Sequence, residues 1–410
     1  MLIKSSTEQV RQQNSVLVLS ALRRHGPQAH TDLSERTGLA SATVSAITAD
    51  LERVGVIGRS EQPPAGGRGR PRTLFSQQRA FGYLITAQIS SDIVHYSLVD
   101  YAGRLIDRFD EPRSHQAPDA ARFAQSFLEA LGRLAERSRI APDDVMAISI
   151  SSKGTVDAAG GVLLWSPLLG GAPIDFAALA APRWKARVTL SNETLLVAQA
   201  LATRQDEADP DQSRLAVVSL GHSIGLGIAR RDRAGEIEAS APNFGHMLDR
   251  ADGGLCRCGA FGCIEASAGF YGILRTAFQV PPDTIPAKFV PLGEMDKIAL
   301  SARQGNRMAS YAFRMGGLAL GNGLSRLLSL YGRLPIFMTG PGTRYLDLLN
   351  PGIEEALGRS HEVRLLGRPP LSIIADEPGL VFDGHLDRAL TEMDHVIAET
   401  RLGLRDSRTA

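Results

Sequence analysis

Apolar residues recur at helical spacing in three short segments near the N-terminus. Segment 15–24 (SVLVLSALRR) is apolar at this spacing and stops at Gly26-Pro27. Thr31 is placed to cap a second helix that ends at Gly38, and Ser41 to cap a third. In the third segment, steps of three and four predict one buried stripe of Val44, Ile47, Leu51 and Val54. Two helices joined by a turn that contains glycine are typical of a helix-turn-helix.

The stretch after the third helix predicts two extended segments joined by a loop. The first begins at 55–58 (GVIG), and a return strand is expected at 73–75 (TLF). Between them lies 62–72, QPPAGGRGRPR. Such a loop after a helix-turn-helix would form a wing, so residues 1–76 are expected to be a winged helix-turn-helix DNA-binding domain. A three-helix protein-interaction domain is the alternative.

The predicted DNA-contacting side chains differ between helix and wing. The outward positions at the start of the third helix are short hydroxyls, Ser41, Thr43 and Ser45. Such side chains discriminate weakly, because Arg, Asn and Gln are the ones that pair bidentately with purine edges. The arginines instead lie in the wing, at Arg68, Arg70 and Arg72. A slim Gly-Arg-Gly-Arg-Pro strip suits a narrow A·T-rich minor groove, so groove width is expected to supply much of the specificity. A solvated linker is the alternative.

From residue 81 onward the pattern changes to short strands alternating with helices. Strands are expected at 81–89, 92–99, 104–106, 215–220, 225–230 and 236–237. Helices are expected at 118–138, at 193–205, over a stretch interrupted by glycines at roughly 297–330, and near the C-terminus, where Leu386, Leu390, Met393 and Ile397 share one face. Two units of strand-turn-strand-turn-strand, each followed by helical sequence, predict two related α/β halves in residues 77–410.

Length, composition and charge narrow the class of protein. A chain of 410 residues suggests two or three domains, and 43% apolar with 22% charged residues is ordinary for a globular protein. No apolar run reaches the roughly 18 residues of a membrane span, and the start MLIKSSTE lacks an export signal. We therefore expect a cytoplasmic protein without a membrane partner. Residues 1–75 hold ten Lys and Arg against six Asp and Glu, a net charge of +4, whereas the remainder carries −3. A basic head on a slightly acidic body suggests that the head binds an anion.

All three cysteines fall between residues 256 and 263. An odd, clustered set argues against a disulfide framework and for a metal site in a reducing compartment, and residues two apart form only a strained disulfide. Three thiols and one imidazole suit tetrahedral zinc, with the ligands His246, Cys256, Cys258 and Cys263. Four protein ligands leave no open position, so the zinc is expected to be structural. Buried free cysteines are the alternative.

On these residues the chain resembles the transcriptional regulators of the ROK family (repressor, open reading frame, kinase), nearly from end to end. The resemblance comprises the winged helix, the Gly245-His246 pair, and Cys-x-Cys-Gly-x-x-Gly-Cys-x-Glu over 256–265, a complete and specific match. It implies an α/β body with the actin-like ATPase fold, which is two-lobed and RNase H-like, around a cleft. Members of the family bind a sugar in that cleft, and some phosphorylate it with ATP.

The phosphate-binding turns of the family's kinases are altered here. Their opening Asp-x-Gly-Gly-Thr is aligned with 86–90, where Thr86 replaces the Asp and both glycines are missing. The second element stands as Gly221-His-Ser-Ile-Gly225, which is partial, and the third as 339–342 (TGPG), also altered. Phosphoryl transfer depends on positioned phosphates and metal, so ATP use is not expected.

The resemblance implies that the ligand-binding residues are Asn192, Glu193, Asn243, His246 and Glu265. Glu193 stands where the kinases carry an Asp general base, and its extra methylene would displace a base from its proton, which favours binding over catalysis. A helix N-terminal Glu favoured by the helix dipole is the alternative. Asn243 replaces a Glu that holds sugar hydroxyls, so the ligand need not be a plain hexose. Lys153 stands in place of a Pro-Gly turn and either pairs with an acidic sugar or phosphate or is a solvated surface lysine.

These features together predict a DNA-binding transcriptional regulator, a repressor without catalytic residues, controlled by a sugar or sugar derivative. The expected partners are operator DNA, a sugar-like effector and further copies of the chain in a dimer or tetramer, with half-sites a helical turn or more apart. The effector is expected to change the angle between the lobes and so the spacing of the heads. A ROK sugar kinase with an attached DNA-binding domain and a constitutive DNA-binding protein with a vestigial cleft are the alternatives.

Overall fold

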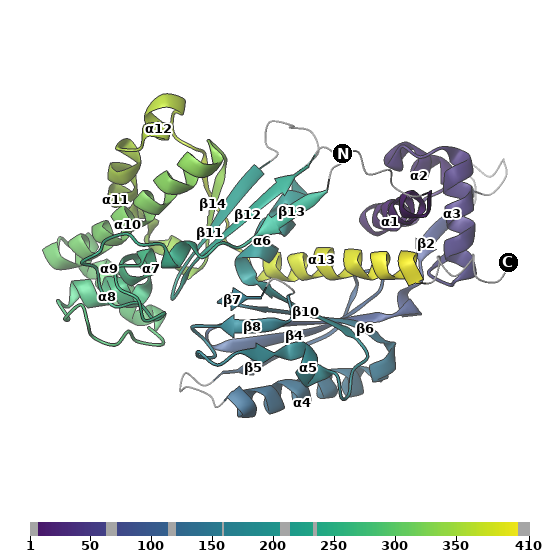
Figure 1. Ribbon diagram of the computed structural model, residues 1–410, viewed down its shortest axis with the longest axis horizontal. Coiled ribbons are helices and arrows are strands. Elements are labelled where there is room, and N and C mark those ends of the chain that lie inside the picture. The colour runs from purple at the N-terminus through teal and green to yellow at the C-terminus, as the bar shows by residue number, and fades with distance from the viewer. Residues whose placement is uncertain are drawn as a thin grey trace.

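The computed structural model describes residues 7–62, 72–113, 120–157, 160–205, 214–232 and 236–400 (Figure 1). Arg68 and Arg70, the two wing arginines predicted to contact DNA, lie outside these residues. In Figure 1 a helical head adjoins one lobe of a two-lobed body, and the last helix, drawn in yellow, runs between them. None of the described helices is long and apolar enough to span a membrane.

The head has the expected order of three helices and two antiparallel strands. Its elements are α1 (Thr7–His25), α2 (His30–Thr37), α3 (Ser41–Arg53), β1 (Ile57–Gln62) and β2 (Arg72–Gln77). The predicted stripe of α3 is buried at Val44, Ile47 and Leu51, while Val54 is half-buried. Gly38 ends α2 as predicted, with φ 69°, but the predictions that Thr31 and Ser41 cap the starts of α2 and α3 were wrong. α2 begins one residue after Ala29, because the Asp32 carboxylate accepts a hydrogen bond from the Ala29 N–H, and α3 begins after Ala40 without a side-chain cap.

The N-terminal lobe is a five-stranded sheet in the order β10-β6-β3-β4-β5. The strands are β3 (Tyr83–Ile89), β4 (Ile93–Asp100), β5 (Leu105–Pro112), β6 (Val145–Ser152) and β10 (Arg187–Asn192). The first three are antiparallel, whereas β6 and β10 run parallel to β3. Helices α4 (Ala120–Ser138) and α5 (Phe176–Ala180) cover one face, and a small sheet of β7 (Thr155–Val156), β8 (Val162–Trp165) and β9 (Ile174–Asp175) lies near the carboxyl ends of β6 and β10.

The C-terminal lobe repeats this plan, which confirms the prediction of two related halves. Its sheet has the order β13-β12-β11-β14-β15, with three antiparallel strands followed by two that run parallel to β11. The strands are β11 (Arg214–Leu220), β12 (Ile224–Arg231), β13 (Ile237–Ser240), β14 (Ile336–Thr339) and β15 (Leu371–Ile373). Helix α6 (Glu193–Arg204) covers one face.

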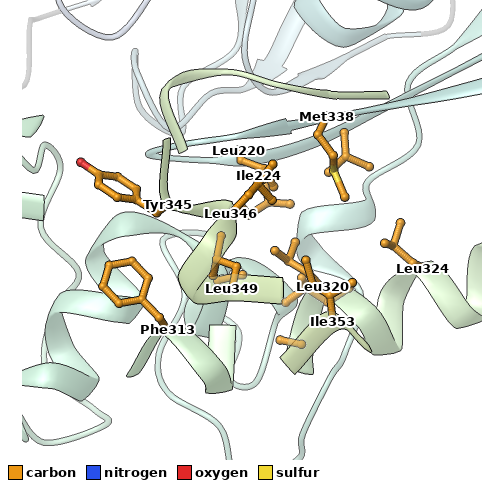
Figure 2. Packing of buried hydrophobic residues seen from close by; sticks show 14 of the residues in the cluster. Leu220, Ile224, Phe313, Leu320, Leu324, Met338, Tyr345, Leu346, Leu349 and Ile353 are labelled. Carbon is orange, nitrogen blue, oxygen red and sulfur yellow. The ribbon is translucent and has the colours of Figure 1, made fainter. Parts of the chain in front are cut away.

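Helices cover the other face of this sheet, and Figure 2 shows Leu220, Ile224 and Met338 of the sheet side packed against Leu320, Leu349 and Ile353. The helices are α7 (Ile264–Ala268), α8 (Phe270–Ala277), α9 (Leu292–Arg303), α10 (Arg307–Tyr331), α11 (Leu346–Gly358) and α12 (His361–Leu366). The stretch expected at roughly 297–330 is therefore two helices, since Gly305 has φ 92° and separates α9 from α10.

The last helix, α13 (Glu377–Thr400), joins head and body (Figure 1). It lies on the face of the N-terminal sheet opposite α4, and its buried residues Leu390, Met393 and Ile397 share one hydrophobic cluster with Leu19 and Leu22 of α1. The head was predicted to end at residue 76, and its last strand, β2, ends at Gln77. The hydrophobic cluster contains residues from both sides of this boundary. The head is thus packed on the body through a common core.

Candidate metal centre and ligand cavity between the lobes

The three cysteines and His246 lie together in a loop that needs glycine. His246 ends a short 3₁₀ helix, η4 (Phe244–His246), and Cys263 directly precedes α7. Two isolated bridges, Leu248 with Cys263 and Leu255 with Phe261, fold the loop back on itself. Gly262 has φ 75°, and a Cβ there would lie 1.7 Å from the Arg250 carbonyl oxygen, so only glycine fits this turn.

The spacing of the donor atoms fits tetrahedral coordination of a cation. One ligand atom from each of His246, Cys256, Cys258 and Cys263 can be chosen so that all four lie within 4.8 Å of one another. The His246 Nδ1 atom is 3.5 Å from Cys256 Sγ, and Cys258 Sγ is 3.7 Å from Cys263 Sγ. Metal–ligand bonds of the lengths typical of zinc give tetrahedral edges of about 3.6 Å for N···S and about 3.8 Å for S···S. The four residues can therefore hold a metal ion, and all three cysteines are unpaired.

A cavity lined by both polar and apolar side chains lies beside this cluster, between the ends of the two sheets. The space not filled by protein atoms there is about 530 Å³, including space open to solvent. All five residues predicted to bind a ligand line it: Asn192, Glu193, Asn243, His246 and Glu265. Trp165 also lines it, with its ring edge-on to the His246 ring at 5.2 Å between centroids. Sequence reasoning missed Trp165, because nothing in the local pattern distinguishes it from a core residue.

Asn192 and Asn243 line the cavity and also form hydrogen bonds with other protein groups. Asn192 is the N-cap of α6, since its carbonyl oxygen accepts a hydrogen bond from the Thr194 N–H at 3.0 Å and its amide donates to the Gly154 carbonyl at 2.8 Å. Asn243 accepts from the Thr155 hydroxyl at 3.4 Å. Asn192 therefore shapes the cavity wall, whereas the hydrogen bond from Thr155 uses only the carbonyl oxygen of the exposed Asn243 side chain.

Glu193 and Lys153 form a buried pair at one end of the cavity. The Lys153 Nζ is 3.8 Å from Glu193 Oε2, and the two side chains are 17% and 3% exposed. The Ser90 hydroxyl donates to the other Glu193 oxygen at 3.4 Å. Of the two interpretations of Lys153, the solvated surface lysine was wrong, because its side chain is only 17% exposed and lies beside Glu193. Burial lowers the pKa of Lys153, but nearby Glu193, Glu377 and Glu265 raise it by more, so the pKa is raised overall.

Glu193 should make the stability of the protein fall with rising pH. Burial raises the pKa of its carboxyl from 4.5 to about 7, although Lys153 opposes the shift. The folded protein then holds this proton more tightly than the unfolded chain. The contribution of the protonated carboxyl to the free energy of unfolding is therefore complete below about pH 4.5 and is lost as pH rises through about 7. At 1.36 kcal/mol per pKa unit the loss is about 3 kcal/mol. We expect Glu193→Gln, whose side chain cannot ionise, to lack this pH-dependent loss of stability. Denaturant titrations of both proteins from pH 5 to 8 measure the difference, and parallel curves would contradict the assignment.

The turns that hold phosphate in the family's kinases are filled by side chains here. The β3–β4 turn lies at Ser90–Asp92, so the strand-end residue nearest Glu193 is Gln88 and not Thr86, the residue aligned from the sequence. Arg113 fixes this turn by donating to the Ser90 carbonyl at 2.7 Å. At the second turn the His222 ring stacks on Phe289 and bonds to the Val290 carbonyl at 2.8 Å.

The third turn is closed by Pro341. A Cβ at Gly221 would meet the Pro341 ring at 3.1 Å, so this proline packs directly on the second turn. Desolvation lowers the pKa of His222 to about 4, so its ring is neutral at physiological pH. The three turns therefore offer packed side chains where a nucleotide would need open backbone.

Four of the six residues predicted to contact DNA, Ser41, Thr43, Ser45 and Arg72, lie among the described residues. Ser41 and Ser45 of α3 are exposed and Thr43 is half-buried. Arg72, at the start of β2, donates to the Asp32 carboxylate at 2.5 Å and to the Thr31 hydroxyl at 3.2 Å. Arg72 thus ties the base of the wing to α2, a role that the sequence alone did not indicate.

Two relatives of known name are similar to this chain over most of their length. A xylose repressor of Caldicellulosiruptor bescii is 21% identical over 357 residues, which cover 85% of this chain and 88% of that protein. The DNA-binding transcriptional dual regulator NagC of Escherichia coli is 23% identical over 356 residues, 85% of each chain.

Solved structures show the same fold. A ROK family transcriptional regulator, described as a homologue of the E. coli MLC protein, superposes with a TM-score of 0.70 at 19% identity and covers 94% of this chain and 99% of its own. A ROK family glucokinase of Streptomyces griseus, solved with glucose and AMPPNP, has a TM-score of 0.53 at 23% identity and covers 75% of this chain and 98% of its own.

Family profiles match both parts of the chain. Residues 13–61 match the IclR helix-turn-helix domain, which agrees with the fold of the head. Residues 100–351, more than half of the chain, match the profile described as ROK family. The chain therefore belongs to the ROK family, and it carries a helix-turn-helix head in front of the ROK body.

Proposed function

We propose that this protein is a DNA-binding transcriptional regulator, a repressor, whose cavity between the lobes binds a sugar or sugar derivative. The observation that carries the proposal is the continuous packing from head to cavity. The helix-turn-helix rests on α13, and Glu377, the first residue of α13, is near enough to Lys153 and Glu193 to influence the pKa of both. Relatives named as xylose and N-acetylglucosamine repressors support it.

The chemistry of the cavity suits a molecule rich in hydroxyl groups. Glu193 and Glu265 offer carboxylate oxygens, Asn243 offers an amide, and Trp165 supplies an apolar wall. Hydroxyls both donate and accept, so they can satisfy carboxylate and amide groups in one site. The effector would bind against these side chains, with the His246 imidazole as a further partner.

We propose zinc as the ion of the metal centre. Three thiolates and one imidazole are a typical set for structural zinc, and four protein ligands leave no position for substrate. When bound, the ion would supply cross-linking of the loop and no chemistry. The residues around it would fix His246 and Glu265 at the cavity wall.

The signal would pass from cavity to head along α13. His385 lies in α13 and is bonded by the hydroxyls of Ser149 and Ser151 in β6, at 2.8 and 3.0 Å, and β6 leads directly to Lys153. Further along the helix, Asp394 holds Arg23 of α1. A ligand that rearranges the Lys153 region would shift α13 and with it the head. It can do so only to the extent that it binds the two arrangements with different affinity.

The second candidate is a sugar kinase, since ROK kinases share the fold of the body. The packed turns at Ser90–Asp92, His222 and Pro341 argue against it, because they leave no backbone cradle for ATP phosphates. Glu193 also stands beside Lys153 rather than free as a base. Release of ADP in a coupled assay with a hexose, pentose, amino sugar or other sugar derivative would favour the kinase.

A two-stage experiment tests the proposed function. Thermal unfolding of the zinc-loaded protein is measured against hexoses, pentoses, amino sugars, polyols, sugar acids and sugar phosphates. A compound at 100 times its Kd should stabilise the protein by about 2.7 kcal/mol. Operator fragments are selected from random DNA with the purified protein, and the same compound should release them.

Asn243→Ala is the matched variant for both stages. It removes an exposed amide at the cavity wall and leaves the head unchanged, so DNA binding should persist while both the thermal shift and the release disappear. Failure to enrich any DNA, or DNA binding unaffected by every compound that stabilises the protein, would refute the proposed regulator.

A further inference from the structure

We propose that Tyr271 is a positioning residue that connects the metal centre to the Glu265 carboxylate, so that the two sites are energetically coupled. Tyr271 lies in the first turn of α8 and is 2% exposed. The inference deepens the proposed function and rests on it in one respect, namely that Glu265 contacts the effector. The coupling itself belongs to the chain and can be measured with metal alone.

The Tyr271 hydroxyl contacts both sites at once. It donates to Cys256 Sγ at 3.3 Å, and it lies 3.4 Å from Glu265 Oε1. A phenol has one proton, so these two acceptors share a single donor. Any change in the position of Cys256 therefore changes the hydrogen bond that reaches the ligand-binding carboxylate.

The Tyr271 ring is held so firmly that it can transmit such a change. The Arg257 guanidinium lies 4.6 Å from the ring centroid and that of Arg275 lies 5.8 Å from it. Arg275 in turn donates to the Leu255 carbonyl at 2.9 Å and to the Ala266 carbonyl at 2.7 Å. Arg275 thus connects the metal-binding loop, α7 and α8 around the ring.

Glu265 depends on Tyr271 for its orientation. The carboxylate is 1% exposed, and its second oxygen accepts a hydrogen bond at 3.2 Å from the N–H of Ile224, the first residue of β12. One oxygen is therefore fixed by the C-terminal sheet and the other by Tyr271. Removing the hydroxyl would leave one anchor, and the carboxylate could rotate about it. Outer partners of metal ligands typically change metal affinity by about 10–100-fold.

A double-mutant cycle with zinc as the probe tests the coupling. Zinc affinity is measured by competition with a chromophoric chelator in the full-length protein, in Glu265→Gln, in Tyr271→Phe and in the double variant. We expect Tyr271→Phe to weaken zinc binding about tenfold. We expect Glu265→Gln to change zinc affinity at least threefold more in the natural background than in the Tyr271→Phe background.

Tyr345→Phe is the matched control. That buried hydroxyl donates to Asp296 at 2.7 Å and touches neither site, so its removal should leave zinc affinity unchanged. A merely structural role of Tyr271 would lower stability without making the effect of Glu265→Gln depend on the background. Equal effects of Glu265→Gln in both backgrounds would overturn the proposal.

The outcome stays decisive if a variant fails to fold. Glu265→Gln alone, which keeps the shape of the side chain, must still alter zinc affinity, and no change there would also overturn the coupling. Thermal shifts with D-xylose and N-acetyl-D-glucosamine are recorded separately. A positive zinc cycle without any response to sugar would contradict the proposed function while leaving the coupling intact.

Discussion

Replacing Asp394 by alanine should destabilise the protein by about 3–5 kcal/mol, because it leaves a buried guanidinium without its partner. Arg23 of α1 donates to both Asp394 oxygens, at 2.6 and 2.8 Å, and the Tyr101 hydroxyl donates to one of them at 2.5 Å. The Asp394 side chain is fully buried and that of Arg23 is 15% exposed. Denaturant unfolding of wild type and variant measures the loss.

The same variant should also uncouple DNA binding by the head from effector binding by the body. With the tie between α1 and α13 broken, protease should cut the head more readily, and an effector should still bind the body but no longer release DNA. Glu238→Ala, which breaks the exposed pair with Arg230, is the control and should change neither property. Unchanged stability in Asp394→Ala would show that the head is held by the apolar cluster alone.

This docking of the head could not have been predicted from the sequence. Arg23 and Asp394 are 371 residues apart, and nothing local distinguishes either from an exposed charge on an amphipathic helix. The three helices of the head were predictable, since Val44, Ile47 and Leu51 recur at helical spacing and are buried. Their N-caps were not, because Asp32 satisfies the start of α2 from inside the helix, whereas Gly38 does end α2 as predicted.

The metal centre could be predicted from the sequence, whereas the shape of the cavity could not. The metal ligands are clustered in sequence, apart from His246, so spacing and donor chemistry were enough to group them. The cavity depends on turns from both lobes. The sequence alone left Lys153 ambiguous, because its partner Glu193 is 40 residues away in the chain and reaches it only where β10 pairs with β6.

Strand register explains the remaining error. Thr86 was aligned with the phosphate-binding Asp of the kinases, but the turn begins only after Ile89, where β3 ends. Side chains alternate along a strand, so a shift of two residues keeps the face and changes the distance from the turn. Gln88 is therefore the residue beside Glu193. The conclusion drawn from the altered turn still rests on Ser90–Asp92, which contains no glycine.

Removing the metal should have the other large effect. We expect Cys263→Ser to abolish stoichiometric zinc binding, because it removes one of the four ligands. The buried Cys263 directly precedes α7, which carries Glu265, so the loss should also reach the cavity wall. Where free metal exceeds its Kd a thousandfold, losing it costs about 4 kcal/mol of stability. Thermal unfolding followed together with metal content measures the effect. The response to effector should vanish with the metal, whereas DNA binding by the head should remain.

Chelator provides the internal control, since this chain has no cysteine outside the cluster. Chelation should lower the unfolding temperature of wild type to that of Cys263→Ser and leave the variant unchanged. A variant that is equally sensitive to chelator would show that its metal lies elsewhere. If verified metal-free wild type kept both its stability and its effector response, the loop between His246 and Cys263 would owe its shape to the glycine turns and to Arg275 alone. The metal would then have no part in ligand recognition.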